Sequence, residues 1–202
     1  IKYAKTDEGT SIYADALCAD GSSMVTEFIY WSDYYNSIIS PFYSYSTGRT
    51  KETLRSSQVT CRDIDDDGYI EIPEDTSSKK QSSEITSQNW VNYGNTVLSH
   101  KCYSFSCKRD GYILVIDDDD FSKVKANYDS ESRKLTIIDK KNKSNVFEIV
   151  TLINSNYSVN DPKYKDYTMI MKNSGFVYLA KVNKSSDIDI NIQTLKDMIK
   201  VY

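Results

Sequence analysis

The chain has 202 residues, of which 39% are hydrophobic and 27% charged, so it can bury a core as one large domain or two small ones. Its net charge is −4 and its basic residues are scattered, which argues against the basic stripe that a nucleic-acid-binding surface requires. No run of eighteen apolar residues occurs, so no membrane-spanning helix is expected in this segment.

Most of the chain alternates between apolar and polar residues with a period of two, which is the pattern of a half-buried strand. Residues 12–18 and 24–31 show it on either side of the turn sequence Ala19-Asp20-Gly21-Ser22, and Asp-Gly between two such runs predicts a β-hairpin. Further strands are expected at residues 59–62, 69–72, 89–93, 96–107, 112–116, 123–128, 134–138, 145–153, 167–172 and 176–182.

The C-terminal segment, residues 192–202, has a different period. Ile192, Leu195 and Ile199 are spaced at i, i+3 and i+7, which predicts an amphipathic helix. The predicted fold class is therefore mostly antiparallel β (α+β), with two β-rich units and a C-terminal helix.

A polar, serine-rich stretch from Glu74 to Ser87 contains almost no apolar residues and has the composition of a linker. It predicts a boundary between two units. The first unit is expected to span residues 1–75, the linker residues 76–87, and the second unit residues 88–202.

Residues 63–74 match the pattern D-x-D-x-D-G-x5-E, which wraps one chain around a hard cation. Calcium takes roughly six to eight oxygen ligands at about 2.3–2.6 Å, so carboxylates must converge from alternate positions of a tightly curled loop. Gly68 allows the positive φ that this curl needs, whereas a solvated acidic turn would leave four aspartates in repulsion. The expected calcium ligands are the carboxylates of Asp63, Asp65 and Asp67 and the carbonyl of Tyr69, with Glu71 or Glu74 closing the site.

The flanks of this loop are β-like in sequence, and Pro73 stands where the outgoing helix of a helix-loop-helix hand would begin. A loop between strands is therefore expected. In such a loop the ninth residue, Glu71, can close the site, and Glu74 becomes optional.

On these residues the loop resembles the calcium loops of FG-GAP/VCBS-type repeats, whose pattern is D-x-D-x-D-G-x-x-D/E between strands. Residues 24–73 are also similar to a segment of secreted Gram-positive lipoproteins of unknown function, and residues 110–116, 123–124 and 129–135 to their C-terminal module. The resemblance implies a secreted or surface-anchored protein and brings no activity with it. Only one loop is present where propeller repeats show several, so a complete propeller is not implied.

The four cysteines, an even number as in secreted proteins, lack the paired spacing of a zinc site. If residues 102–107 form one straight strand, Cys102 and Cys107 start roughly 16 Å apart, so a bridge between them would need a bend. A Cys18–Cys61 disulfide is slightly favoured, and free buried thiols are the other possibility.

Three further groups of residues are candidate sites. His100 and Cys102 could share a strand face as a Cys/His nucleophile, but neighbours on one strand rarely reach that geometry, so a half-exposed strand histidine is expected. Residues 117–120 form a second acidic run without alternate spacing or glycine, which predicts a solvated turn. Trp31, Trp90 and the tyrosines could stack on sugars, although ordinary strand packing is favoured.

Together these features predict an extracellular, non-catalytic surface or lipoprotein module with a structural calcium ion. The alternatives are a carbohydrate- or protein-binding module that uses exposed aromatics, and a polymer-degrading hydrolase with carboxylates about 5–10 Å apart. The expected partner is an extracellular glycan or protein, with no nucleic acid, and the expected state is a monomer.

Overall fold

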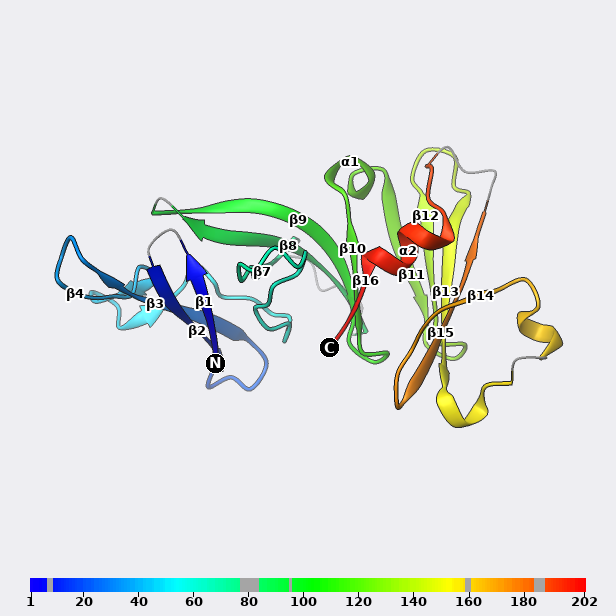
Figure 1. Ribbon diagram of the computed structural model, residues 1–202, viewed down its shortest axis with the longest axis horizontal. Coiled ribbons are helices and arrows are strands. Elements are labelled where there is room, and N and C mark those ends of the chain that lie inside the picture. Colours follow the sequence, from blue (N-terminus) through cyan, green and yellow to red (C-terminus); the bar gives the residue numbers. More distant parts are fainter. Residues whose placement is uncertain (7–8, 77–83, 95, 159–160, 184–187) are drawn as a thin grey trace. The chain divides into compact units, whose positions relative to one another are not determined.

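The computed structural model describes residues 1–202 except 7–8, 77–83, 95, 159–160 and 184–187. It is mostly β, with antiparallel sheets and a short helix near the C-terminus, which confirms the predicted fold class (Figure 1). The chain divides into two compact units, Ile1–Gln81 with Thr86–Ser104 and Ser82–Ile85 with Phe105–Tyr202. None of the helices in the described part of the chain has the length and apolarity needed to cross a membrane.

This division differs from the predicted boundary after residue 87. β8 (Ile85–Gly94) starts within the predicted linker and pairs antiparallel with β7 (Ile72–Asp75), so residues 86–104 belong to the first unit. Residues 77–83 of the predicted linker lie outside the described residues. Ser87, the last residue of the predicted linker, is buried within β8 although its side chain is polar.

The first unit contains a four-stranded antiparallel sheet in the order β1-β2-β3-β4. Leu17 pairs with Met24 at the end of the β2–β3 hairpin, and Gly21 adopts φ +69° in the turn, as the Asp20-Gly21 sequence predicts. The strands of this sheet are β1 Lys2–Thr6, β2 Gly9–Leu17, β3 Met24–Ser32 and β4 Ser37–Ile39. The other strands of the unit are β5 Tyr43–Ser44, β6 Arg49–Thr50, β7, β8 and the first part of β9 (Val97–Cys107).

The inner face of the β1–β4 sheet carries an aromatic core. Tyr13 and Phe28 lie opposite each other across β2 and β3 with ring centroids 4.9 Å apart, and Phe28 lies 4.8 Å from Tyr93 of β8. Because side chains alternate along a strand, the other faces of β2 and β3 point away from this core. The buried members of the core are Tyr13, Phe28, Tyr30, Phe42, Cys61, Ile72, Val91 and Tyr93.

A buried ion pair attaches the segment before the acidic loop to this sheet. The fully buried Arg55 guanidinium lies 2.8 Å from the Asp15 carboxylate of β2 and donates to the Val59 carbonyl at 2.8 Å. Asp15 also accepts from Cys61, whose backbone N–H donates to both carboxylate oxygens at 3.2 and 3.1 Å. The entrance of the acidic loop is thereby held to the sheet, two residues before Asp63.

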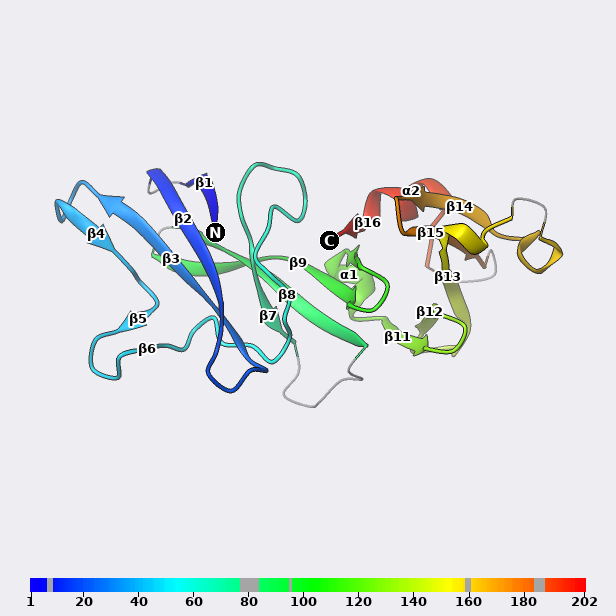
Figure 2. The same cartoon turned by 90° about the horizontal axis from the view of Figure 1, so that it is seen from below.

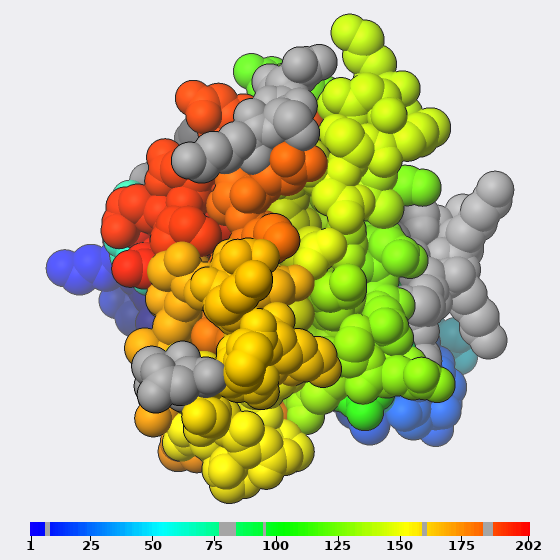
Figure 3. Space-filling model, turned by 90° about the vertical axis from the view of Figure 1, so that its right-hand side faces the viewer, coloured from blue at the N-terminus to red at the C-terminus, as the bar shows by residue number. Residues whose placement is uncertain are grey.

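In the second unit a five-stranded sheet has the order β11-β12-β13-β15-β14, and β16 pairs antiparallel with β10. Helix α2 packs against β14 and β15, as Figure 3 shows for the red and orange segments. The strands are β10 Tyr112–Ile116, β11 Val124–Asp129, β12 Lys134–Asp139, β13 Asn145–Ile153, β14 Thr168–Lys172, β15 Phe176–Val182 and β16 Ile199–Val201. Short 3-10 helices span Asn154–Asn156 and Pro162–Tyr164.

The predicted C-terminal helix is shorter than expected. Helix α2 spans Ile192–Met198, capped by the Asn191 side chain, and the chain then becomes strand β16. Ile199 and Val201 pair with β10. Ile199 fits the helical spacing, but β-branched residues at alternate positions also favour a strand. The acidic run at residues 117–120 was also predicted imprecisely, because Asp118–Phe121 forms the one-turn helix α1.

The favoured Cys18–Cys61 disulfide is not present, and none of the four cysteines forms a disulfide. The Cys61 thiol is buried and donates to Asp15 at 3.1 Å; burial and this neighbouring carboxylate raise its pKa to about 12. Cys107 is buried beside Asp110, and its pKa is raised to about 12 in the same way. Neither thiol is a reactive nucleophile at neutral pH.

Candidate metal centre

The acidic loop is closed by a β-bridge. Arg62 N–H donates to the Glu71 carbonyl at 3.0 Å, and Glu71 N–H donates back to the Arg62 carbonyl at 2.8 Å. Strand β7 follows directly, and the loop is the teal segment that leads into it in Figure 2. The loop therefore lies between extended segments and not between two helices, as Pro73 and the flanking sequence predicted.

The backbone curls around the Asp63 carboxylate, which accepts hydrogen bonds from Asp67 N–H at 3.1 Å and Gly68 N–H at 2.9 Å. The curl needs two residues with left-handed backbone, Asp66 at φ +63° and Gly68 at φ +91°. A side chain at position 68 would meet no atom within 4 Å, so it is this φ that favours glycine there.

The curl brings three carboxylates together. One carboxylate oxygen from each of Asp63, Asp65 and Glu71 lies within 4.8 Å of the other two. Oxygens that bind one calcium ion at about 2.3–2.6 Å cannot be more than roughly 5 Å apart, so this spacing fits a single shared ion. We refer to these three residues as the carboxylate triad.

Glu71 is the unusual member of the triad because its side chain is fully buried. Its Oε2 accepts a hydrogen bond from Ile64 N–H at 3.0 Å, but no described residue gives Oε1 a partner. Burial raises its pKa to about 7; the bond from Ile64 opposes this rise, and the negative charges of the nearby aspartates add to it. A buried carboxylate oxygen without a partner is costly, and a cation would supply the missing interaction.

The other predicted ligands have different partners in the structure. Asp67 accepts from Tyr69 N–H at 2.9 Å through Oδ1 and contacts Lys101 through Oδ2, so it lies outside the triad. Glu74, in β7, accepts from the Asn89 side chain at 2.9 Å. The Tyr69 ring is partly exposed, and the binding role of its carbonyl stays a prediction. The geometry thus favours Glu71 over Glu74 as the closing ligand.

Lys101 contacts the acidic loop, and the sequence did not predict this contact. It lies on β9, and its Nζ is 3.2 Å from Asp65 Oδ2 and 2.5 Å from Asp67 Oδ2. The hydrogen bond to Asp67 is the main reason why the pKa of Lys101 lies above its ordinary value. Its position in the sequence, 34 residues after Asp67, gives no local signal of the contact.

Comparisons with protein-family models, with curated proteins and with solved structures found no match. The resemblance to FG-GAP/VCBS-type loops therefore stays a prediction. The case for a metal centre rests on the loop's own geometry.

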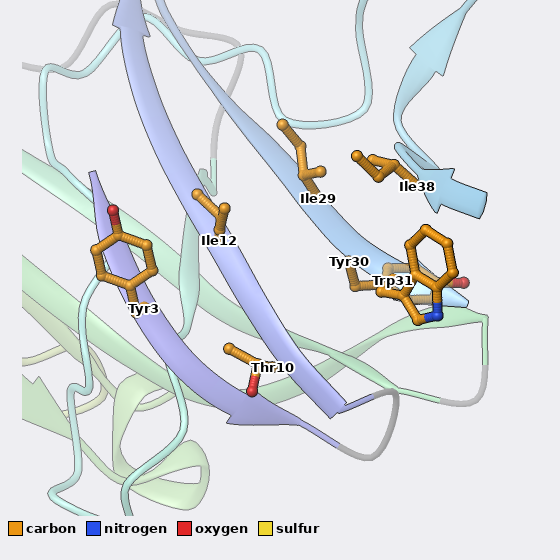
Figure 4. Close-up of a pocket in the computed structure, with 7 residues that line it drawn as sticks. All are labelled: Tyr3, Thr10, Ile12, Ile29, Tyr30, Trp31 and Ile38. Carbon is orange, nitrogen blue, oxygen red and sulfur yellow. The ribbon is translucent and has the colours of Figure 1, made fainter. Parts of the chain in front are cut away.

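A second candidate site lies on the outer face of the β1–β4 sheet, where a hollow of about 360 Å³ opens (Figure 4). Trp31 is 50% exposed there, and its indole N–H donates to Asp33 at 2.9 Å, which fixes the ring on the surface. Ile38, paired with Trp31 across β3 and β4, is also exposed. The residues that line the hollow are Tyr3, Thr10, Ile12, Ile29, Tyr30, Trp31 and Ile38.

The remaining candidates from the sequence are accounted for by ordinary packing. Trp90 is fully buried and donates to the Ser104 hydroxyl at 2.8 Å, so it is a core residue and no sugar platform. His100 is an exposed residue of β9 whose ring nitrogen contacts Asn89. Of the two tryptophans, only Trp31 can meet a ligand at the surface.

Proposed function

We propose that the protein is an extracellular, non-catalytic module whose first unit is stabilised by a calcium ion bound in the loop of residues 63–71. The observation that carries the proposal is the buried Glu71 oxygen without a partner beside the carboxylates of Asp63 and Asp65. A cation at the triad would neutralise the three acids and give Glu71 its missing interaction.

The donor set favours calcium over other common ions. The triad offers only oxygen, whereas zinc and copper prefer the nitrogen and sulfur of histidine and cysteine. Magnesium requires near-ideal octahedral geometry and keeps its waters, whereas calcium accepts an irregular set of carboxylate, carbonyl and water oxygens. Sites in extracellular modules typically bind calcium with dissociation constants of about 10⁻⁴–10⁻³ M, which suits a loop with only three convergent carboxylates.

The ion would stabilise the fold and take no part in a reaction. A ligand that binds only the native state stabilises it by mass action. The loop joins the Asp15-anchored segment to β7 through the bridge between Arg62 and Glu71, so ordering the loop orders both of its ends. The resemblance of residues 24–73 to a segment of secreted lipoproteins supports the extracellular setting.

Thermal unfolding with 10 mM calcium chloride and with excess chelator tests the proposal. We expect calcium to raise the melting temperature by about 5–10 °C, since an ion at ten or more times its dissociation constant contributes roughly 1.4 kcal/mol or more. Glu71→Gln should remove most of this rise, whereas the matched variant Glu74→Gln should keep it. Coincident wild-type melts with and without calcium would refute the calcium site.

We propose as a second candidate function that the hollow beside Trp31 binds apolar side chains of a protein partner. Its lining is aromatic and aliphatic apart from Thr10 and the tyrosine hydroxyls, and sugar recognition needs more directional polar groups than these. An exposed apolar face with a fixed tryptophan suits a protein interface, where tryptophan is enriched among the residues that dominate binding.

Fluorescence titration with the apolar dye anilinonaphthalene sulfonate and with a soluble cello-oligosaccharide tests this second candidate. We expect dye binding that Trp31→Ala weakens at least about fivefold, because the variant removes the largest apolar wall of the hollow. The matched control is Ile153→Ala, an exposed apolar residue of the second unit, which should leave binding unchanged. Binding of the oligosaccharide alone would show instead that the hollow is a glycan site.

A further inference from the structure

Lys101 reaches into the acidic loop from a distant strand. Its ammonium group lies against the carboxylates of Asp65 and Asp67, at 3.2 and 2.5 Å. All three side chains are only about one-third exposed, so the contact is partly shielded from water. Among the ion pairs of the described residues, Lys101 is the cation that contacts the aspartates of the loop.

Asp65 belongs both to this ion pair and to the carboxylate triad. An ion bound to Asp65 at about 2.3–2.6 Å and an ammonium 3.2 Å from the same carboxylate would stand within roughly 8 Å of each other. That separation is no larger than one Debye length at physiological salt, so solvent ions screen the repulsion between the two charges incompletely. Calcium and the Lys101 ammonium therefore compete for one carboxylate.

Calcium and Lys101 also compete for the carboxylate of Asp67. Its Oδ2 is held by Lys101, and the loop pattern places Asp67 among the expected calcium ligands. For Asp67 to bind the ion through that oxygen, the contact with Lys101 has to break. Through that oxygen, the site gains a fourth carboxylate only if the lysine moves away.

We propose that Lys101 is a built-in counterion that holds the loop together without calcium and lowers the affinity of the site for the ion. This inference rests on the proposed calcium site. The lysine compensates part of the repulsion among the aspartates in the metal-free protein, and calcium binding releases it. A neutral residue at position 101 should therefore bind calcium more tightly and be less stable without it.

Isothermal titration of calcium chloride into the chelator-treated protein measures the effect. We expect Lys101→Met to bind calcium roughly 5–50-fold more tightly than the wild type, the range that one screened charge repulsion at about 7 Å produces. Lys51→Met, which removes an exposed lysine of the same unit, is the control for net charge and should change the affinity less than about twofold. Lys101→Arg should stay close to the wild type.

The outcomes separate this inference from the calcium site itself. Calcium binding by the wild type with unchanged or weaker binding by Lys101→Met would overturn the role of Lys101 and leave the site intact. Absence of binding by both proteins would overturn the site and the inference with it. If Lys101→Met does not fold without calcium, Lys101→Gln, which retains hydrogen bonding but carries no charge, provides the same comparison.

Discussion

In the presence of chelator, the first unit is expected to lose stability as the pH rises from about 4.5 to about 7. Burial raises the pKa of Glu71 from 4.5 to about 7 in the folded state, whereas the unfolded chain keeps the ordinary value. Across this window the folded state binds more protons than the unfolded state, so stability falls with rising pH. The loss attributable to Glu71 is at most about 3 kcal/mol, complete once the carboxylate is ionised.

Calcium should abolish this fall in stability. The ion binds the ionised carboxylate, so at saturating calcium chloride the cost of ionising Glu71 is offset and stability no longer falls across the window. Urea unfolding at several pH values, with chelator and with calcium, measures both curves. The same slope under the two conditions would mean that no ion reaches Glu71.

Glu71→Gln isolates the titrating group. Other acids shift the other way; the pKa values of Asp67 and Asp75 are lowered in the folded state and add stability as they ionise at lower pH. These contributions are present in both proteins, so the difference between wild type and Glu71→Gln reports Glu71 alone. We expect the variant to lack the fall between pH 4.5 and 7, and a fall of equal size in the variant would assign the effect to another group.

The loop could be read from the sequence because its determinants are local. The spacing of the aspartates, the glycine at the positive φ and the proline after the ninth residue all lie within twelve positions. From these residues the sequence predicts a curled backbone, extended flanks and Glu71, more than Glu74, as the closing ligand. The missing partner of the Glu71 oxygen was not predictable, because it depends on how deeply the core buries that side chain.

Contacts between distant segments could not be predicted either, because they also depend on the tertiary structure and not on local sequence. Lys101 meets Asp67 across 34 residues, and β8 pairs with β7 although its first three residues, 85–87, lie in the predicted linker. At the C-terminus the residues from Ile199 onward fit both a helical and a strand period. Pairing with β10 stabilises the strand over the helix, and this tertiary interaction cannot be recognised from a local pattern.

Breaking the buried ion pair between Asp15 and Arg55 is expected to have the largest effect on stability. Asp15→Ala leaves the fully buried guanidinium without its counter-charge and removes the acceptor for the Cys61 N–H, so we expect a loss of about 3–5 kcal/mol. Urea unfolding measures it. The matched control is Asp166→Ala, which breaks the exposed pair of Asp166 with Lys181 and should cost less than about 1 kcal/mol.

The double variant Asp15→Ala/Arg55→Met separates two causes of the stability loss: the unpaired charge of Arg55 and the lost hydrogen bonds to Asp15. Removing both charges eliminates the uncompensated guanidinium, so the double variant should be more stable than Asp15→Ala alone. It still lacks the acceptor that holds Cys61 at the entrance of the acidic loop, so calcium binding should stay weaker than in the wild type. If the double variant were no more stable than Asp15→Ala, the loss would come from the anchoring of Cys61 and not from the charge of Arg55.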